Sequence, residues 1–309
     1  MSPTNHDPSY LRLSKEAIDT RSRRIRERMS SCDLCPRNCG VDRLSGELGR
    51  CATGERALVA SAGPHMGEEK PLRGTHGSGT IFFAGCNLGC IFCQNWELSA
   101  EPARSGRPLR SGDLGALMLQ LQELGCHNIN LVSPSHVAGS ILDAISWAAE
   151  RGLRLPLVYN SGGYDSMDTL RYLEDVVDIY MPDFKYWDPG VAASLSDAPD
   201  YPEIARNAIS EMHRQVGDLT LDAAGVATRG LLVRHLVLPG DLSGTAGVTK
   251  FLAHDISRDT FLNIMDQYRP AHRSRTHPPL DRPVRQEEIR VAIRLAEDAG
   301  LRRIYERHR

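Results

Sequence analysis

The 309-residue sequence lacks several features that would place it in a broad class at once. It has no apolar run long enough to span a bilayer and no charged-then-apolar N-terminal signal, so we expect a cytoplasmic protein with no membrane partner. Its formal net charge is only −2, which gives no general electrostatic reason to expect a nucleic acid partner. Its 41% hydrophobic and 25% charged residues are typical of a globular protein.

Several common catalytic motifs are also missing. The sequence contains no GxSxG, no Walker lysine loop and no Rossmann glycine fingerprint after a predicted strand. The glycine-rich stretch GTHGSGT at 74–80 precedes an apolar segment instead of following one, which is the wrong side for a phosphate cradle. These absences leave nucleotide-binding and serine-hydrolase classes without support.

Cysteine is almost absent from most of the chain. Cys126 is the one cysteine outside residues 32–93, and its place in ELGCHNINL predicts a buried, small apolar residue. The other seven cysteines are clustered. A disulfide framework is typical of short secreted chains, whereas clustered cysteines in a long cytosolic chain more often hold metal. We therefore expect metal ligation.

The segments after residue 76 alternate between apolar runs and amphipathic helices. The predicted strands are 80–85, 128–133, 155–160, 177–184, 230–239 and 260–265. The predicted helices are 113–124, 137–151, 166–174, 201–217, 244–254 and 286–299. This alternation indicates an α/β fold with a parallel sheet and crossover helices, either partly closed into a barrel or open.

Two regions precede this body. Residues 1–30 form a polar segment, in which RSRRIRERMS is better interpreted as a solvated helix face than as an anion contact. Residues 31–75 form a small Cys-rich module, and 76–309 the α/β body with its C-terminal helix. Most predicted strands run into polar or glycine-rich loops, the edge at which parallel α/β folds place their chemistry.

The stretch AGCNLGCIFCQNWEL at 84–98 follows the first predicted strand and contains Cys86, Cys90 and Cys93. Thiolates suit both zinc and iron–sulfur clusters. A structural zinc site needs four ligands, and no Cys or His lies between 94 and 125. A cluster held by three cysteines leaves one iron open to a small molecule. The alternative is a zinc site completed by a distant His.

Cys86, Cys90, Phe92 and Cys93 resemble the CxxxCxΦC motif of radical S-adenosylmethionine (SAM) enzymes, where Φ is aromatic. The resemblance implies a partial (β/α)6 TIM-type barrel and a 4Fe–4S cluster that binds SAM and cleaves it reductively to a 5′-deoxyadenosyl radical. Over about residues 32–270, the chain also resembles the iron–sulfur proteins related to pyruvate formate-lyase activating enzymes (PflX-like). The matching stretches are the segment 84–98 and CDLCPRNC, SPSH, YNSGGY, DIYMPDFKY, VRHLVLPG and NIMDQYRP.

The same resemblance implies cofactor-binding positions, each with a plainer alternative. Activating enzymes carry Gly-Gly-Glu after the second strand, where this chain has VSPSHV; its polar residues could replace those hydrogen bonds or simply start a helix. The NSGG stretch matches a SAM-lining turn, and Asp-x-Lys matches a pair that faces SAM and substrate, with a solvated ion pair as the alternative. The implied residues are Ser133, Ser135, His136, Asn160, Ser161, Asp183 and Lys185.

In LLVRHLVLPG, strand alternation directs one of Arg234 and His235 inward, and we expect His235 there, also as a cofactor-binding residue. No catalytic residue beyond the cluster ligands is assigned. Cys32, Cys35, Cys39 and Cys51 supply four thiolates within twenty residues, which predicts a second metal site, either iron–sulfur or zinc, with a structural or electron-relaying role.

These observations favour an enzyme that cleaves SAM and abstracts a hydrogen atom, with a glycyl-radical partner protein as one substrate that the resemblance implies. A protein or peptide substrate is one expectation and a small-molecule substrate is the other, and both require an external electron donor of the flavodoxin or ferredoxin type. The alternative is a non-enzymatic zinc-binding or interaction protein on an α/β scaffold. Fold-level resemblance does not name the substrate.

Overall fold

The computed structural model describes residues 7–305. Residues 1–6 of the expected polar segment and residues 306–309 of the expected C-terminal region lie outside the described residues. Within 7–305, no helix has both the length and the apolar character needed to cross a membrane.

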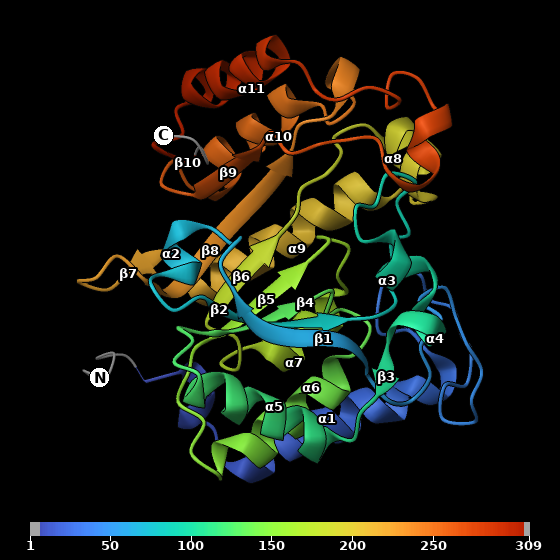
Figure 1. Ribbon diagram of the computed structural model, residues 1–309, viewed down its shortest axis with the longest axis vertical. Coiled ribbons are helices and arrows are strands. Elements are labelled where there is room, and N and C mark those ends of the chain that lie inside the picture. Colours follow the sequence, from blue (N-terminus) through green and yellow to red (C-terminus); the bar gives the residue numbers. More distant parts are fainter. Residues whose placement is uncertain (1–6, 306–309) are drawn as a thin grey trace.

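A mixed sheet forms the centre of the described chain (Figure 1). Its strands are β1 (Leu58–His65), β2 (Ser78–Phe83), β3 (Arg107–Pro108), β4 (Ile129–Val132), β5 (Leu157–Ser161), β6 (Ile179–Pro182), β7 (Thr220–Leu221), β8 (Ala227–Leu236), β9 (Phe261–Met265) and β10 (Arg303–Tyr305). The order is β10-β9-β8-β6-β5-β4-β2-β1-β3, with β7 paired to β8. Neighbours from β2 to β10 along this order are parallel, whereas β1 runs antiparallel to β2 and β3.

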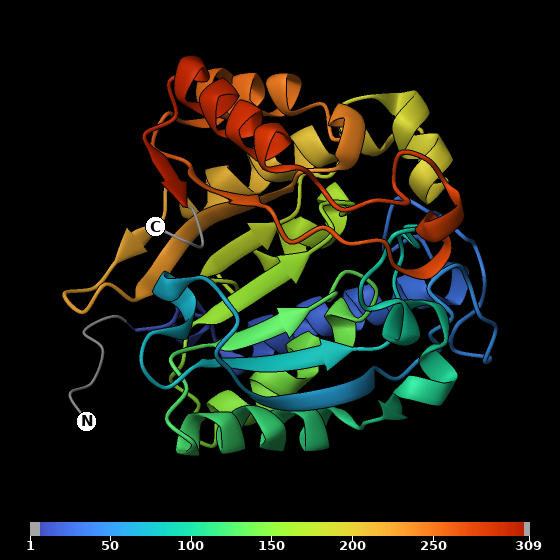
Figure 2. The same ribbon diagram turned by 45° about the horizontal axis from the view of Figure 1, so that its top comes forward.

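Helices connect the parallel strands, as such strands require. The α-helices are α1 (Lys15–Glu27), α2 (Lys70–Arg73), α3 (Trp96–Ala100), α4 (Pro102–Ser105), α5 (Ser111–Glu123), α6 (Ala138–Ala149), α7 (Met167–Leu173), α8 (Pro189–Ser196), α9 (Tyr201–Val216), α10 (Thr245–Phe251) and α11 (Gln286–Ala299). Short helical turns are η1 (Ser9–Arg12), η2 (Arg28–Ser31), η3 (Pro239–Asp241), η4 (Leu252–Ile256) and η5 (His272–Thr276). Figure 2 shows the sheet curving, with its strands fanning out between the helices.

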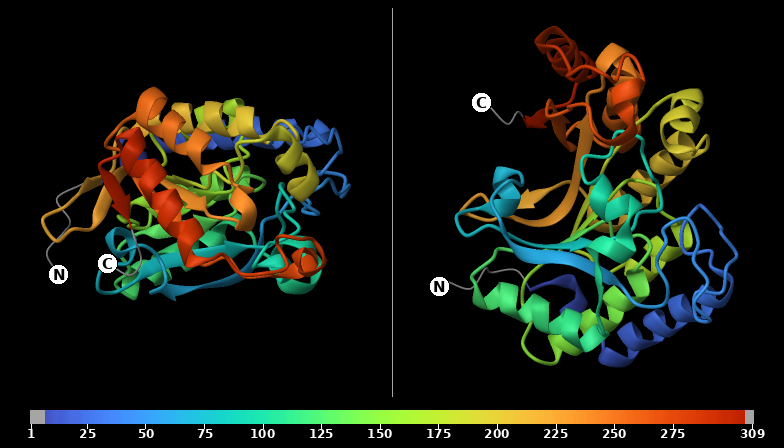
Figure 3. Two further views of the ribbon diagram at one scale, coloured as in Figure 1. Left: turned by 90° about the horizontal axis from the view of Figure 1, so that it is seen from above. Right: turned by 45° about the vertical axis from the view of Figure 1, so that its right-hand side comes forward.

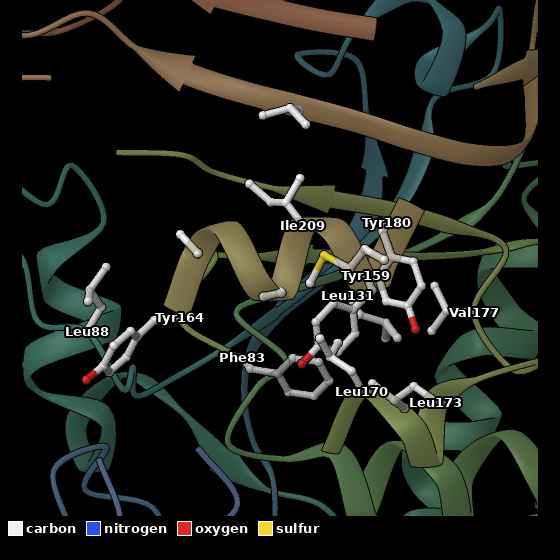
Figure 4. Close-up of a cluster of buried hydrophobic side chains, with 14 of the residues drawn as sticks. Phe83, Leu88, Leu131, Tyr159, Tyr164, Leu170, Leu173, Val177, Tyr180 and Ile209 are labelled. Carbon is white, nitrogen blue, oxygen red and sulfur yellow. The ribbon is translucent and has the colours of Figure 1, made fainter. Parts of the chain in front are cut away.

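Successive strand residues point to opposite faces, so each strand contributes to two apolar layers. On the helix side, strand residues such as Leu131, Tyr159 and Tyr180 pack with α7 and α9 in the main core (Figure 4). On the other face Val158, Ile179, Met181, Leu232 and Phe261 form a second buried cluster with Leu72 of α2. Because both faces are buried, the sequences of these strands are nearly continuous apolar runs.

The predicted strand–helix alternation is confirmed, and each predicted strand and helix overlaps an observed element. The N-terminal helix has the expected solvated face, because Arg23, Arg24 and Arg26 of α1 are exposed. Its opposite stripe packs against α6, so Ile18 and Ile25 are 2% and 0% exposed. An amphipathic helix with few apolar residues can still bury the residues it has when their spacing is helical.

Candidate functional site

The first cysteine loop follows β2 at the carboxyl edge of the sheet. Ser196 donates a hydrogen bond to the Cys90 sulfur over 3.0 Å, the Leu88 N–H donates to Cys86 over 3.4 Å, and Ser99 donates to Cys93 over 3.4 Å. Phe92 lies buried between the rings of Tyr186 and Tyr268 and anchors the loop to the core. The three thiols of Cys86, Cys90 and Cys93 therefore each have a hydrogen-bond donor from the chain.

The thiols lie close together in a desolvated place. Burial, and after it the neighbouring Cys90 and Cys93, raise the pKa of Cys86 to about 11. Burial also raises the pKa of Cys93, while Ser99 and the Lys185 ammonium oppose that rise. Because the raised pKa values of Cys86 and Cys93 disfavour their thiolate forms, metal binding would stabilise those forms.

The arrangement suits a cluster. Among the described residues, no three or more His, Cys, Asp or Glu side chains are placed to hold a single metal ion. A 4Fe–4S cluster does not need such convergence, because each thiolate binds a different iron, and hydrogen bonds to the sulfurs are a normal part of such sites. Three thiols with a donor each, at the rim of an open cavity, fit a cluster with one iron left free for a further ligand.

A cavity of about 650 Å³ opens beside this loop and is lined by residues at the carboxyl ends of strands across the sheet, from β1 and β2 to β9 and β10. Six of the expected cofactor-binding residues line it, together with the cysteines: Ser133, Ser135, Asn160, Ser161, Asp183 and Lys185. This volume is that of a small-molecule site. Ser133 has φ of +59°, a left-handed conformation that is rare without glycine and marks a constrained position beside the cavity.

A buried carboxylate that the sequence did not indicate organises two of these serines. Asp165 accepts hydrogen bonds from Ser135 and Ser161, each over 2.6 Å, and from Tyr159 over 2.9 Å. Burial raises the pKa of Asp165 above its ordinary value even though the three hydroxyl groups oppose the rise. Asp165 therefore lies behind the cavity wall, which both serines line, and fixes their hydroxyl groups from the loop after β5.

Asp183 and Lys185 form a partly buried ion pair in the cavity wall, with side chains 21% and 16% exposed. Tyr201 holds the segment, because its hydroxyl accepts from the Lys185 N–H and contacts the Asp183 carbonyl oxygen, both at 2.9 Å. Burial opposes the charge on Lys185, but Asp183 and then Cys90 keep its pKa raised. The pair is thus a fixed wall element and not a solvated surface pair.

Two expected residues lie away from the cavity. The His235 ring is bonded to the Phe184 carbonyl oxygen at 2.7 Å and to the Thr245 hydroxyl at 2.9 Å, on the helix side of β8. Arg234 lines the cavity in its place, so the expected orientation of this pair is corrected. The His136 ring contacts the Ala84 carbonyl oxygen at 3.0 Å, in the plainer structural position considered for it.

Arg234 belongs to a charged network that sequence patterns did not reveal. Its guanidinium pairs with Glu68 and Glu69, which precede α2, and Asn263 of β9 also donates to Glu69 (at 2.5 Å). Glu69 is 3% exposed. The partners are some 165 residues apart in sequence, so no local pattern could have indicated the network. It closes the cavity on the side of α2.

Comparison with known proteins gives the following relationships. No family model matches the chain. The uncharacterized protein MJ0674 of Methanocaldococcus jannaschii is 30% identical over 284 residues, which is 89% of this chain and 77% of that protein. The crystal structure of a radical SAM methyltransferase from Sphaerobacter thermophilus is similar at a TM-score of 0.48 and 14% identity, over 73% of this chain; the chain covers 65% of that protein's length.

Proposed function

The chain belongs to the same family as the uncharacterized protein MJ0674, and we propose that it is a radical SAM enzyme. The observation that carries the proposal is the shared cavity. Cys86, Cys90 and Cys93 stand at its rim, and polar side chains from the carboxyl ends of the strands line its wall. The CxxxCxΦC spacing and the open order of the parallel strands, which suits a partial barrel, agree with this proposal.

In the proposed reaction Cys86, Cys90 and Cys93 hold a 4Fe–4S cluster. The chemistry that such a cluster would supply when bound is one-electron reduction of the SAM sulfonium, which would release methionine and a 5′-deoxyadenosyl radical. The chain positions SAM and excludes water. Ser135 and Ser161, both fixed by Asp165, offer hydroxyl groups, and the Asp183–Lys185 pair offers one anion and one cation to the polar parts of SAM.

The substrate is the finer part of the proposal. The radical would abstract a hydrogen atom from a molecule in the rest of the cavity, and a glycine Cα of a partner protein is the substrate that the motif resemblance implies. Arg234, Asn263 and Glu68 line this remaining part and would contact the substrate or the far end of SAM. A flavodoxin- or ferredoxin-type protein would supply the electron.

Single cysteine variants test the cluster assignment. Cys86→Ala, Cys90→Ala and Cys93→Ala each remove one ligand, so each is expected to abolish 5′-deoxyadenosine formation by anaerobically reconstituted protein. Cys126→Ala is the matched control and should retain activity, since Cys126 is buried and precedes β4, at the opposite end of the parallel strands from the cysteine loop after β2. Wild-type cleavage in any of the three variants would refute the assignment.

A further inference from the structure

Arg37 links two groups of cysteines by hydrogen bonds. The first group is Cys86, Cys90 and Cys93, and the second group is Cys32, Cys35, Cys39 and Cys51, on the loop that contains Arg37. Its guanidinium donates to the carbonyl oxygens of Asn87 at 2.7 Å and Leu88 at 2.8 Å, both between Cys86 and Cys90. It also donates to the Ser196 carbonyl oxygen at 2.7 Å, and the Ser196 hydroxyl bonds to Cys90. Figure 3 shows the blue loop that carries the second group (the N-terminal loop) lying beside the teal segment of the cysteine loop after β2.

The two groups also touch directly. A Cβ on Gly85 would lie 2.5 Å from the Cys51 carbonyl oxygen, so the residue before Cys86 packs against the backbone of Cys51. Asn87 follows Cys86, and its side chain donates to the Tyr164 carbonyl oxygen at 2.7 Å and lies close enough to Cys35 to lower the pKa of that thiol. One layer of chain therefore separates the two sets of thiols.

The second group is compact and mostly buried. Cys32, Cys35 and Cys51 are 7%, 8% and 8% exposed, and burial, with the neighbouring Cys51 and Cys32 as lesser causes, raises the pKa of Cys35 to about 12. Cys39 is more exposed, and its sulfur accepts a hydrogen bond of 3.4 Å from the N–H of Arg50, the residue before Cys51. All four thiols thus lie within one small loop.

A buried cation stands among these thiols. Arg43 is 2% exposed and donates to the carbonyl oxygens of Gly54 and His136, and its Nη1 lies 3.8 Å from the Cys32 sulfur. Within residues 7–305, no carboxylate forms a salt bridge with it. A buried charge is costly without an opposite charge nearby, and neutral thiols supply none. Thiolates bound to a metal group would supply it.

We propose that Cys32, Cys35, Cys39 and Cys51 hold a second iron–sulfur cluster, which receives electrons and passes them to the first site. One electron enters from a reduced protein donor of the ferredoxin or flavodoxin type and one leaves, so no bond forms or breaks there. The shared wall of Gly85, Asn87 and Arg37 favours a redox group over zinc, because zinc carries no electrons. The relay rests on the proposed function, whereas the cluster itself does not.

Metal analysis of the Cys86→Ala, Cys90→Ala, Cys93→Ala triple variant tests the cluster. After anaerobic reconstitution we expect about four irons per chain in the variant and about eight in the wild type, because each cluster contains four. One zinc, or no iron, in the folded triple variant would overturn the proposal. Should that variant fail to fold, the wild type still decides, since about four irons in all would contradict a second cluster.

The relay is tested with Cys39→Ala, because Cys39 is the most exposed of the four and its loss disturbs packing least. Cleavage of SAM is measured with a reduced ferredoxin and, separately, with dithionite. We expect the rate with ferredoxin to fall about tenfold or more while the rate with dithionite stays near that of wild type. Equal rates for variant and wild type with ferredoxin would overturn the relay. Loss of cleavage in wild type with both reductants would instead contradict the proposed function.

Discussion

Gly85 is the residue at which the two cysteine groups meet, and no side chain fits there. Its φ is +86°, and an added Cβ would lie 2.5 Å from the Cys51 carbonyl oxygen and 2.6 Å from the Thr53 hydroxyl. The backbone conformation alone would cost a residue with a side chain about 1–3 kcal/mol. Gly85 thus allows the cysteine loop to approach the N-terminal loop.

We therefore expect Gly85→Ala to lower the melting temperature and the iron content. The matched control is Gly63→Ala, because a Cβ at Gly63 meets no atom within 4 Å. Thermal unfolding and iron analysis of the two variants provide the comparison. Wild-type iron content and stability in Gly85→Ala would show that the contact is unimportant.

Asp183 is the second residue whose role can be isolated. Asp183→Asn keeps its size but removes the charge that faces Lys185, so we expect SAM to bind about 10–100-fold more weakly while the cluster is retained. The control is Asp175→Asn on the exposed surface. Equilibrium binding of SAM and the visible spectrum of the cluster are measured together. An unchanged affinity for SAM would show that the Asp183–Lys185 pair has only a structural role.

At the scale of elements, α2 and the two glutamates before it seal one side of the cavity. Burial alone would raise the pKa of Glu69, but the charge and hydrogen bonds of Arg234, with the bond from Asn263, hold that pKa below its ordinary value. A carboxyl whose pKa is lower in the folded state stabilises the fold above its unfolded pKa, and this stabilisation disappears as the pH falls through the folded pKa.

Glu69→Gln should therefore destabilise the protein at neutral pH by about 1–3 kcal/mol, because it removes one of the two buried carboxylates that pair with Arg234 while Glu68 remains. The difference from wild type should shrink as the pH falls through the lowered pKa of Glu69. Chemical unfolding across pH measures both effects. Glu287→Gln, on the exposed side of α11, is the control and should change stability by about 0–1 kcal/mol. A pH-independent difference would contradict the ion-pair account.

The elements also show what sequence reasoning can reach. The strands from β2 to β9 in the parallel sheet were predictable because burial on both faces makes them apolar runs with polar loops after them. β1 was missed, because LVASAGPH is half exposed and has no clear alternation. Alternation along β8 shows that one of Arg234 and His235 faces the cavity but not which of the two. Glu68 and Glu69, which pair with Arg234 there, are distant in sequence and leave no pattern in the sequence of β8.

At the scale of the whole molecule, a curved sheet brings together residues that are distant in sequence. The cavity combines the cysteine loop after β2, serines after β4 and β5, the ion pair after β6 and Arg234 of β8. The sequence predicted most of these positions, since the carboxyl ends of parallel strands share one edge. It did not predict Asp165, because a carboxylate in a loop has no distinguishing pattern until burial and its three donors are seen.

The measurement that tests the central claim most directly is the yield of 5′-deoxyadenosine from the wild-type protein. The protein is reconstituted anaerobically with iron and sulfide, then incubated with SAM and dithionite, with a reaction lacking reductant as the control. The account predicts a brown protein that forms 5′-deoxyadenosine only when the reductant is present. A colourless, zinc-loaded protein that leaves SAM intact would contradict it and favour a binding protein on the same scaffold.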